Sequence, residues 1–231
     1  MKKLIKYFTR TEWTLWMSSM GAIMLAFLFS PENDFLSVIS SLLGVTALIF
    51  CAKGNPFGQV LMIIFCVMYG IISYTCAYYG EVLTYVFMTG PMAVYALISW
   101  LRNPYDGNKA EVKVNRISRN ETLIMIGLSI LVTVIFFFVL KVFGTANLLI
   151  STLSVTTSFL AVYLTARRSP FYAVAYAAND VVLIVLWLLA SITNPEYIST
   201  LACFAVFLAN DIYGFISWRR MEKRQNAAAH M

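Results

Sequence analysis

The residues best suited to chemistry are two copies of the tripeptide Ala-Asn-Asp. Ala178-Asn179-Asp180 lies near the middle of the apolar run 171–191, and Ala209-Asn210-Asp211 lies near the middle of the run 198–218. In a bilayer, an ionisable side chain at this depth costs roughly 3 kcal/mol or more unless it is partnered, and such residues mark substrate or ion pathways. We therefore take both amide–carboxylate pairs as candidate substrate-binding residues.

If the two runs are helices, each pair lies on a face with aromatic residues. The helical spacing places Tyr176, Asn179 and Asp180 together, and Trp187 continues that face. Phe207, Asn210, Asp211, Gly214 and Trp218 form the corresponding face of the next run. Since only a short turn joins the runs, we expect antiparallel neighbouring helices whose polar groups converge.

These groups suit a polar organic ligand that carries an aromatic ring. An asparagine offers one acceptor and two donors, which fit a carboxamide or a base edge, and an aspartate accepts from ribose hydroxyls. Tyrosine and tryptophan rings stack on a base and attract a cation such as a pyridinium. The alternative is that the asparagines and aspartates only join helices to one another by hydrogen bonds.

The composition requires a membrane protein. Of the 231 residues 60% are hydrophobic and 12% are charged, and the mean hydropathy is +0.76. A soluble domain carries about 25% charged residues. The single histidine is His230, and the four cysteines lie in or beside apolar runs. We therefore expect no metal, no cofactor, no nucleophile–base pair and no enzyme activity.

Eight apolar runs are long enough to cross a bilayer, which needs about 20 residues per helix. They are 13–30, 35–52, 57–77, 82–101, 122–142, 147–166, 171–191 and 198–218. If both termini lie in the cytoplasm, 16 of the 17 lysines and arginines lie on the cytoplasmic side of the membrane, and Lys141 alone lies on the opposite side. The positive-inside rule therefore predicts cytoplasmic termini.

An internal repeat follows when the chain is shifted by 114 residues. Residues 35–57 align with 149–171 without a gap, and Ser99-Trp100 aligns with Ser217-Trp218 after a four-residue insertion. Three helices plus one linker helix plus three helices give two repeats of the same orientation, as in transporters of the SWEET type. The predicted fold is therefore all-α, with an extra N-terminal helix before a 3+1+3 parallel repeat.

This repeat divides the chain into six segments. They are an extra transmembrane helix (1–30), the first three-helix repeat (35–101), a basic cytoplasmic loop (102–121), the linker helix (122–146), the second repeat (147–218) and a cytoplasmic tail (219–231). In such transporters the substrate binds near the midplane between the repeats. From the first repeat we add Gln59 and Tyr69 to the candidate site, and from the hydroxyl-rich run 147–166 we add Thr157 and Ser158.

Three motifs resemble the PnuC family of bacterial nicotinamide riboside transporters. They are Tyr69-Gly70 with Tyr78-Tyr79-Gly80-Glu81, Pro91-Met92 and Trp100; Ser158 with Ala161-Val162-Tyr163-Leu164 and Arg167-Arg168; and Asn179 with Tyr213-Gly214 and Trp218. The resemblance implies a bacterial inner-membrane protein, a homotrimer and facilitated diffusion of a vitamin or nucleoside that a cytoplasmic kinase then phosphorylates. It also adds Tyr213 to the candidate site, and it implies a small-molecule substrate and no nucleic acid.

Some positions depart from the family pattern. Tyr172 and Ala175 stand where the family has two tryptophans before Asn179, and Ala93 stands where a glutamine often follows the Pro-Met pair. These departures favour a subgroup with a related substrate, such as a deoxynucleoside. A proton-coupled carrier of a hydroxyl-rich or cationic solute, in which Asp180 or Asp211 titrates, is the alternative function.

Overall fold

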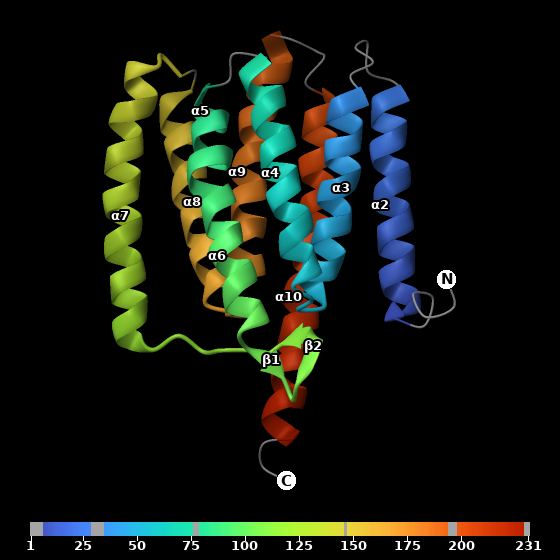
Figure 1. The fold of residues 1–231 in the computed structure, drawn as a ribbon. Coiled ribbons are helices and arrows are strands. Elements are labelled where there is room, and N and C mark those ends of the chain that lie inside the picture. The colour runs from blue at the N-terminus through green and yellow to red at the C-terminus, as the bar shows by residue number, and fades with distance from the viewer. Residues whose placement is uncertain (1–6, 29–34, 76–78, 146, 194–197, 229–231) are drawn as a thin grey trace.

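The apolar runs form long helices that stand side by side (Figure 1). The structure is a computed structural model, and it describes residues 7–28, 35–75, 79–145, 147–193 and 198–228. The helices are α2 (Arg10–Leu28), α3 (Phe35–Ala52), α4 (Phe57–Thr75), α5 (Tyr79–Val82), η1 (Leu83–Thr89), α6 (Gly90–Leu101), α7 (Arg119–Val142), α8 (Leu148–Ala166), α9 (Tyr172–Thr193) and α10 (Ile198–Ala228). In Figure 1, α7 and α2 stand at opposite edges of the bundle.

The helices have the length and composition of membrane spans. In the described part of the chain seven segments qualify, beginning with α3 and counting α5, η1 and α6 as one. Helix α2, whose first turn carries Arg10 and Glu12, runs beside them but is not among the seven. The prediction of an all-helical membrane protein with about eight upright helices is therefore confirmed in this form.

The fourth predicted span is one continuous but irregular helix. Its middle part, η1, is a π-helix in which the Gly90 N–H donates to the Tyr85 carbonyl, five residues back. Pro91 follows directly, and it has no N–H to give to an α-helical hydrogen bond. Prolines and π-turns are common causes of helix irregularity, so the sequence Gly90-Pro91 explains why the wider π-turns precede α6.

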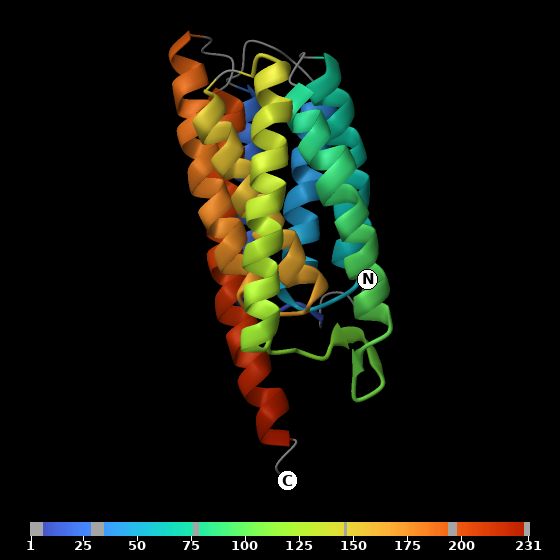
Figure 2. The ribbon, with the colours of Figure 1, turned by 90° about the vertical axis from the view of Figure 1, so that its left-hand side faces the viewer.

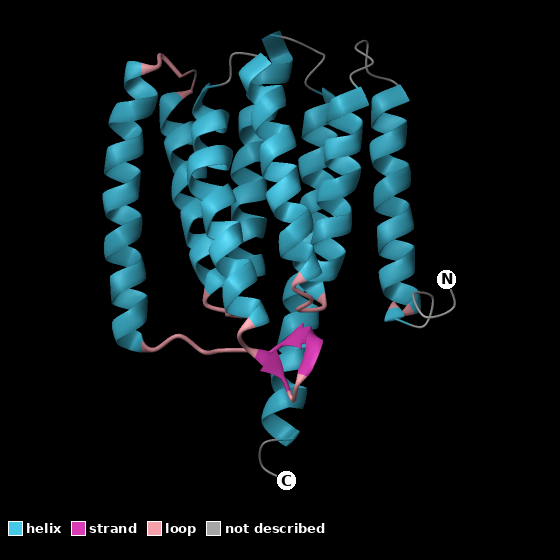
Figure 3. Cartoon of the chain, in the orientation of Figure 1, coloured by secondary structure: helices cyan, strands magenta, loops and turns pink. Residues whose placement is uncertain are grey.

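The segment that the sequence predicts as a loop contains a small β-hairpin. Strands β1 (Pro104–Tyr105) and β2 (Asn108–Val112) pair in antiparallel fashion. Asp106 and Gly107 connect them with φ angles of 48° and 72°, and a two-residue turn with two positive φ angles favours Asp-Gly. Figure 3 shows these two strands of the described chain in magenta. We call the end of the bundle that carries them the hairpin end, and the opposite end the far end.

Helix α10 continues beyond the bundle at the hairpin end (Figure 2). Trp218, Met221, Glu222 and Gln225 are buried at helical spacing, so one face of this extension is covered. Gln225 Nε2 donates to the Val112 carbonyl at 3.0 Å, and its Oε1 accepts from the backbone of the following segment. The predicted tail 219–231 therefore begins as a helix that is docked on β2.

The turns after α3 and after α8 have the same geometry. Gly54 and Arg168, which are 114 positions apart, both have positive φ angles, of 65° and 59°. The Gly54 N–H donates to the Cys51 carbonyl at 2.8 Å, and the Arg168 N–H donates to the Thr165 carbonyl at 3.0 Å. The next residue in each turn repeats the pattern. The Asn55 N–H donates to the Phe50 carbonyl and the Ser169 N–H donates to the Leu164 carbonyl, each at 3.0 Å. These two hydrogen bonds after α3 thus have counterparts 114 residues later.

Candidate functional site

Asn179 on α9 is held by two hydroxyl groups of α8. Its Oδ1 accepts from Thr157 Oγ1 at 2.8 Å and from Ser158 Oγ at 3.0 Å. All three residues were predicted to bind substrate, and the structure brings them together in the bundle, where Asn179 is only 4% exposed. Because both hydroxyls occupy the carbonyl oxygen, the amide nitrogen is the group that Asn179 can offer to a ligand.

Asp180 on α9 and Asp211 on α10 form the second contact. Their carboxyl groups lie within hydrogen-bonding range of each other, and both residues are 4% exposed. Two ionised carboxylates are acceptors only, so they form a hydrogen bond only when one of them carries a proton. Asp180 Oδ2 is buried and has no hydrogen-bond donor among the described residues. The structure therefore brings these two predicted residues together as an acid pair.

Asn210 faces the N-terminal helix. Its Nδ2 donates to Ser19 Oγ on α2 at 2.9 Å and to the carbonyl of Val206 on its own helix at 2.9 Å. Its Oδ1 is buried and has no partner within the described residues. This contact is the helix–helix hydrogen bond that the sequence left open as an alternative to substrate binding.

The two Ala-Asn-Asp copies thus connect four helices. Successive residues of an α-helix point about 100° apart, so an asparagine and the aspartate after it face different neighbours. On α9, Asn179 faces α8 and Asp180 faces α10; on α10, Asp211 faces α9 and Asn210 faces α2. We call this set of residues the polar layer: Ser19, Thr157, Ser158, Asn179, Asp180, Asn210 and Asp211.

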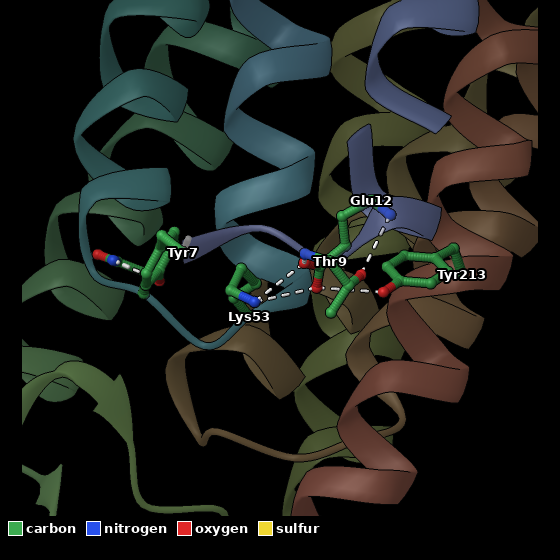
Figure 4. A network of polar contacts seen from close by, with 6 residues as sticks. Tyr7, Thr9, Glu12, Lys53 and Tyr213 are labelled. Atoms are coloured by element: carbon green, nitrogen blue, oxygen red, sulfur yellow. Dashed lines mark hydrogen bonds and ion pairs between the residues drawn. The ribbon is translucent and has the colours of Figure 1, made fainter. Parts of the chain in front are cut away.

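Tyr213 lies in a different network at the hairpin end (Figure 4). Its hydroxyl donates to Glu12 Oε1 at 3.1 Å, and Lys53 Nζ forms a salt bridge with the same carboxylate at 3.0 Å. Glu12 Oε2 also accepts from the Thr9 backbone N–H at 2.7 Å. Glu12 is 3% exposed, so this network fixes the start of α2 against α3 and α10. We therefore place Tyr213 with helix docking and not with Asn179.

The other predicted residues are spread along the bundle. Gln59 is buried near the hairpin end, where its Nε2 lies 3.3 Å from Cys51 Sγ. Tyr69 stacks on Phe65 with ring centroids 5.6 Å apart, and it lies 4.5 Å from the Tyr85 ring. Tyr176 packs against Tyr172, one turn before Asn179. None of these contacts involves the polar layer, and substrate binding by Gln59, Tyr69 and Tyr176 remains a prediction.

Trp187 lines a cavity of about 260 Å³ at the far end, between α5, η1, the α7–α8 turn, α8 and α9. Glu81 and Asn147 also line it, and neither was predicted to bind substrate because both stand at the ends of apolar runs. Ser151 and Ser154 line the same cavity. The sequence left pathway lining and plain helix packing equally open for these two serines.

Comparisons with known proteins agree on one family. The model of the nicotinamide mononucleotide transporter family matches residues 34–220. The nicotinamide riboside transporter PnuC of Neisseria mucosa is 24% identical over 211 residues, covering 90% of this chain and 80% of the relative. The crystal structure of the vitamin B3 transporter PnuC superposes with a TM-score of 0.82 at 23% identity, covering 94% of both chains. The expected resemblance to PnuC is thus confirmed, and the family is one of transporters and not of enzymes.

Proposed function

Since the chain belongs to the nicotinamide mononucleotide transporter family, we propose that it carries a nucleoside-like vitamin or a nucleoside across the membrane. Nicotinamide riboside is the first candidate, because the relative from Neisseria mucosa is named for it. A deoxynucleoside is the second candidate. The departures at Tyr172, Ala175 and Ala93 favour it, because two stacking rings and an amide are missing there.

The observation that carries this proposal is the geometry of Asn179. Two hydroxyls fix its carbonyl oxygen, so the side chain is held in one orientation without a ligand. A site that is organised before binding loses less entropy when the ligand arrives. The fixed amide nitrogen supplies two donors, which match a carboxamide or base oxygen.

The contacts inside the bundle support a transporter built from two parallel repeats. The turns after α3 and α8 match each other, and two hydrogen bonds run reciprocally between the repeats. Trp100 Nε1 donates to the Thr165 carbonyl, and Trp218 Nε1 donates to the Cys51 carbonyl, both at 2.8 Å. Trp100 aligns with Trp218 and Cys51 aligns with Thr165, so each repeat holds the other by the same contact. Rocking of one repeat against the other would then expose the polar layer alternately to the two sides.

We further propose that the hairpin end faces the cytoplasm of a bacterium and that the protein is a homotrimer in the inner membrane. The described lysines and arginines support this orientation: all except Lys141 lie at the helix ends and loops of the hairpin end or on the part of α10 that extends beyond the bundle there, as the positive-inside rule requires. Uptake would be facilitated diffusion, with phosphorylation by a cytoplasmic kinase retaining the product. Among the described residues, no lysine or arginine lies in the polar layer to bind a phosphate group. This favours the unphosphorylated nucleoside as substrate.

Uptake by proteoliposomes tests the proposal. We expect downhill uptake of labelled nicotinamide riboside or of a deoxynucleoside by the wild type. Asn179→Ala should lower this uptake at least tenfold, because one or two buried hydrogen bonds are worth about 1–3 kcal/mol. Asn226→Ala, which removes an exposed amide near the end of α10, is the matched control. Equal uptake in the wild type and Asn179→Ala would contradict the assigned site.

The contact between Asp180 and Asp211 favours one alternative, a proton-coupled carrier. A carboxyl pair that shares a proton can release it when a substrate displaces one member. Such a carrier concentrates its substrate when the outside is more acidic than the inside. Uptake that stops at equal concentrations, with or without a pH gradient, excludes this alternative and leaves the uniporter.

A further inference from the structure

The cavity at the far end lies beside the polar layer but does not include it. Ser151 and Ser154 of α8 face the cavity, and Thr157 and Ser158 bind Asn179. Ser154 precedes Thr157 and Ser158 by three and four residues, which is about one helical turn, or about 5 Å along the axis. A row of hydroxyls on α8 therefore leads from the cavity to the polar layer.

The acid of this cavity is Glu81. Its neighbour Gly80 packs closely on α7, because a Cβ there would lie 2.9 Å from Leu140 Cδ2. This close packing holds α5 against the cavity wall and sets the position of Glu81. The lining contains no lysine or arginine, and no ion pair among the described residues involves Glu81. The cavity thus has a carboxyl group without a protein counter-charge.

The remaining lining supplies the other contacts of a nucleoside. Trp187 adds an aromatic ring, and Asn147, Ser151 and Ser154 add amide and hydroxyl groups. The volume of about 260 Å³ lies just below the range of roughly 300–1,000 Å³ that small-molecule sites occupy, which suits a compact solute. A carboxylate and an indole are also the groups that attract a ring bearing a positive charge.

From this geometry we infer that the cavity is a second, outer substrate site, which binds a cationic nucleoside before it reaches Asn179. Glu81 supplies the counter-charge for the positive ring, Trp187 contacts the ring, and the α8 serines and Asn147 bind the sugar hydroxyls. This inference rests on the proposed transport of a nucleoside-like solute. It names the positive charge as the property that the outer site selects.

Two probes of nearly the same shape test this selection. Nicotinamide riboside has a positively charged ring, whereas its dihydro form is neutral and keeps the sugar and the carboxamide. In proteoliposomes, Glu81→Gln should raise the KM for the cation roughly tenfold and change the KM for the neutral form less than about twofold, because a charge-assisted contact is lost. Glu81→Asp should restore part of the preference. Asp106→Asn, which removes an exposed acid from the hairpin turn, should change neither KM.

The outcomes separate this inference from the proposed function. If the wild type carries both probes and Glu81→Gln alters their KM values equally or not at all, the outer cation site is overturned and the transport function stands. If the wild type carries neither probe and no deoxynucleoside, the transport function fails, and the outer site is judged by thiol labelling.

For that labelling, Ser154→Cys is placed in a chain whose four native cysteines are replaced by alanine. Positively charged methanethiosulfonate should then react about tenfold faster than the negatively charged reagent, and Glu81→Gln should abolish the difference. Equal rates for the two reagents, or no reaction with either, would overturn the outer site. Gel filtration of each variant confirms that the chain has folded.

Discussion

The indole rings of Trp100 and Trp218 lie 5.4 Å apart between centroids, at the hairpin end of α6 and α10. Both rings are fully buried, and each donates its Nε1–H to a backbone carbonyl at the end of a helix in the other half of the chain. The carbonyls of Thr165 and Cys51 also accept from the Arg168 and Gly54 N–H groups, so each indole adds a second hydrogen bond to a carbonyl at a helix end. The two tryptophans therefore join the halves of the bundle by a reciprocal contact.

If the two halves are repeats, these tryptophans should contribute equally to stability. Trp100→Phe and Trp218→Phe each keep a ring but remove one of the two hydrogen bonds that the buried carbonyl accepts. We expect each to lower the free energy of unfolding by about 0.5–1.5 kcal/mol. Thermal unfolding in detergent measures this, with Trp13→Phe near the start of α2 as the control. A loss confined to one tryptophan would contradict an equivalent role.

The two asparagines of the polar layer should differ in their effects. Asn210 binds Ser19 on α2, whereas Asn179 presents its amide nitrogen beside α8. We therefore expect Asn210→Ala to lower the melting temperature and to leave the KM of uptake within about threefold of the wild type. Asn179→Ala should lower uptake at least tenfold. Ser19→Ala should reproduce the Asn210→Ala result, and a strong KM effect of Asn210→Ala alone would place substrate there.

Glu12 should be needed to dock the N-terminal helix. Its carboxylate accepts from Lys53, Tyr213 and the Thr9 backbone, and Glu12→Ala leaves these buried donors unpaired. We expect this change to cost about 1–3 kcal/mol and to make α2 more accessible to protease. Tyr213→Phe removes one donor only and should cost less. Equal protease resistance in Glu12→Ala and the wild type would contradict this role.

Substitutions in the turns after α3 and α8 should change stability in opposite directions. Gly54→Ala puts a side chain at a φ of 65°, and its Cβ would also lie 3.0 Å from Met221 Cε. A left-handed residue costs roughly 1–2 kcal/mol, so Gly54→Ala should destabilise the protein. Arg168→Gly relieves the same strain and should be neutral or stabilising. Gly127→Ala, in the open middle of α7, is the control, because no atom lies within 4 Å of its added Cβ.

The sequence predicts the helices well, because a span of about 20 apolar residues has few other ways to satisfy its backbone in a membrane. The family was also predictable from residue patterns such as Tyr213-Gly214 and Trp218. Asp106-Gly107 is a strong hairpin signal, although the many lysines and arginines of this segment favour a loop. The stripe Trp218, Met221 and Gln225 likewise indicated that α10 continues past the membrane.

The site was only partly predictable, because helical periodicity shows which residues share a face but not which neighbour that face meets. Asn179, Thr157 and Ser158 were each predicted to bind substrate, and the structure places the three in contact. Asn210 was predicted from its helical face and Tyr213 from the family resemblance, yet both meet α2, whose position no pattern in the sequence specified. Glu81 stands at the end of a run, where acids are expected at the membrane surface, and only the fold shows that it lines a cavity.

Helix α10 runs without interruption from Ile198 to Ala228, and therefore connects Asp211 in the membrane to Gln225 at the hairpin. At 1.5 Å per residue these two positions lie about 21 Å apart on one rigid rod. If solute binding at Asp211 turns this helix, Gln225 must turn against the Val112 carbonyl and the Val114 N–H, to which it is hydrogen-bonded. A fluorophore on the hairpin would thus report occupancy in the membrane from the water-exposed side.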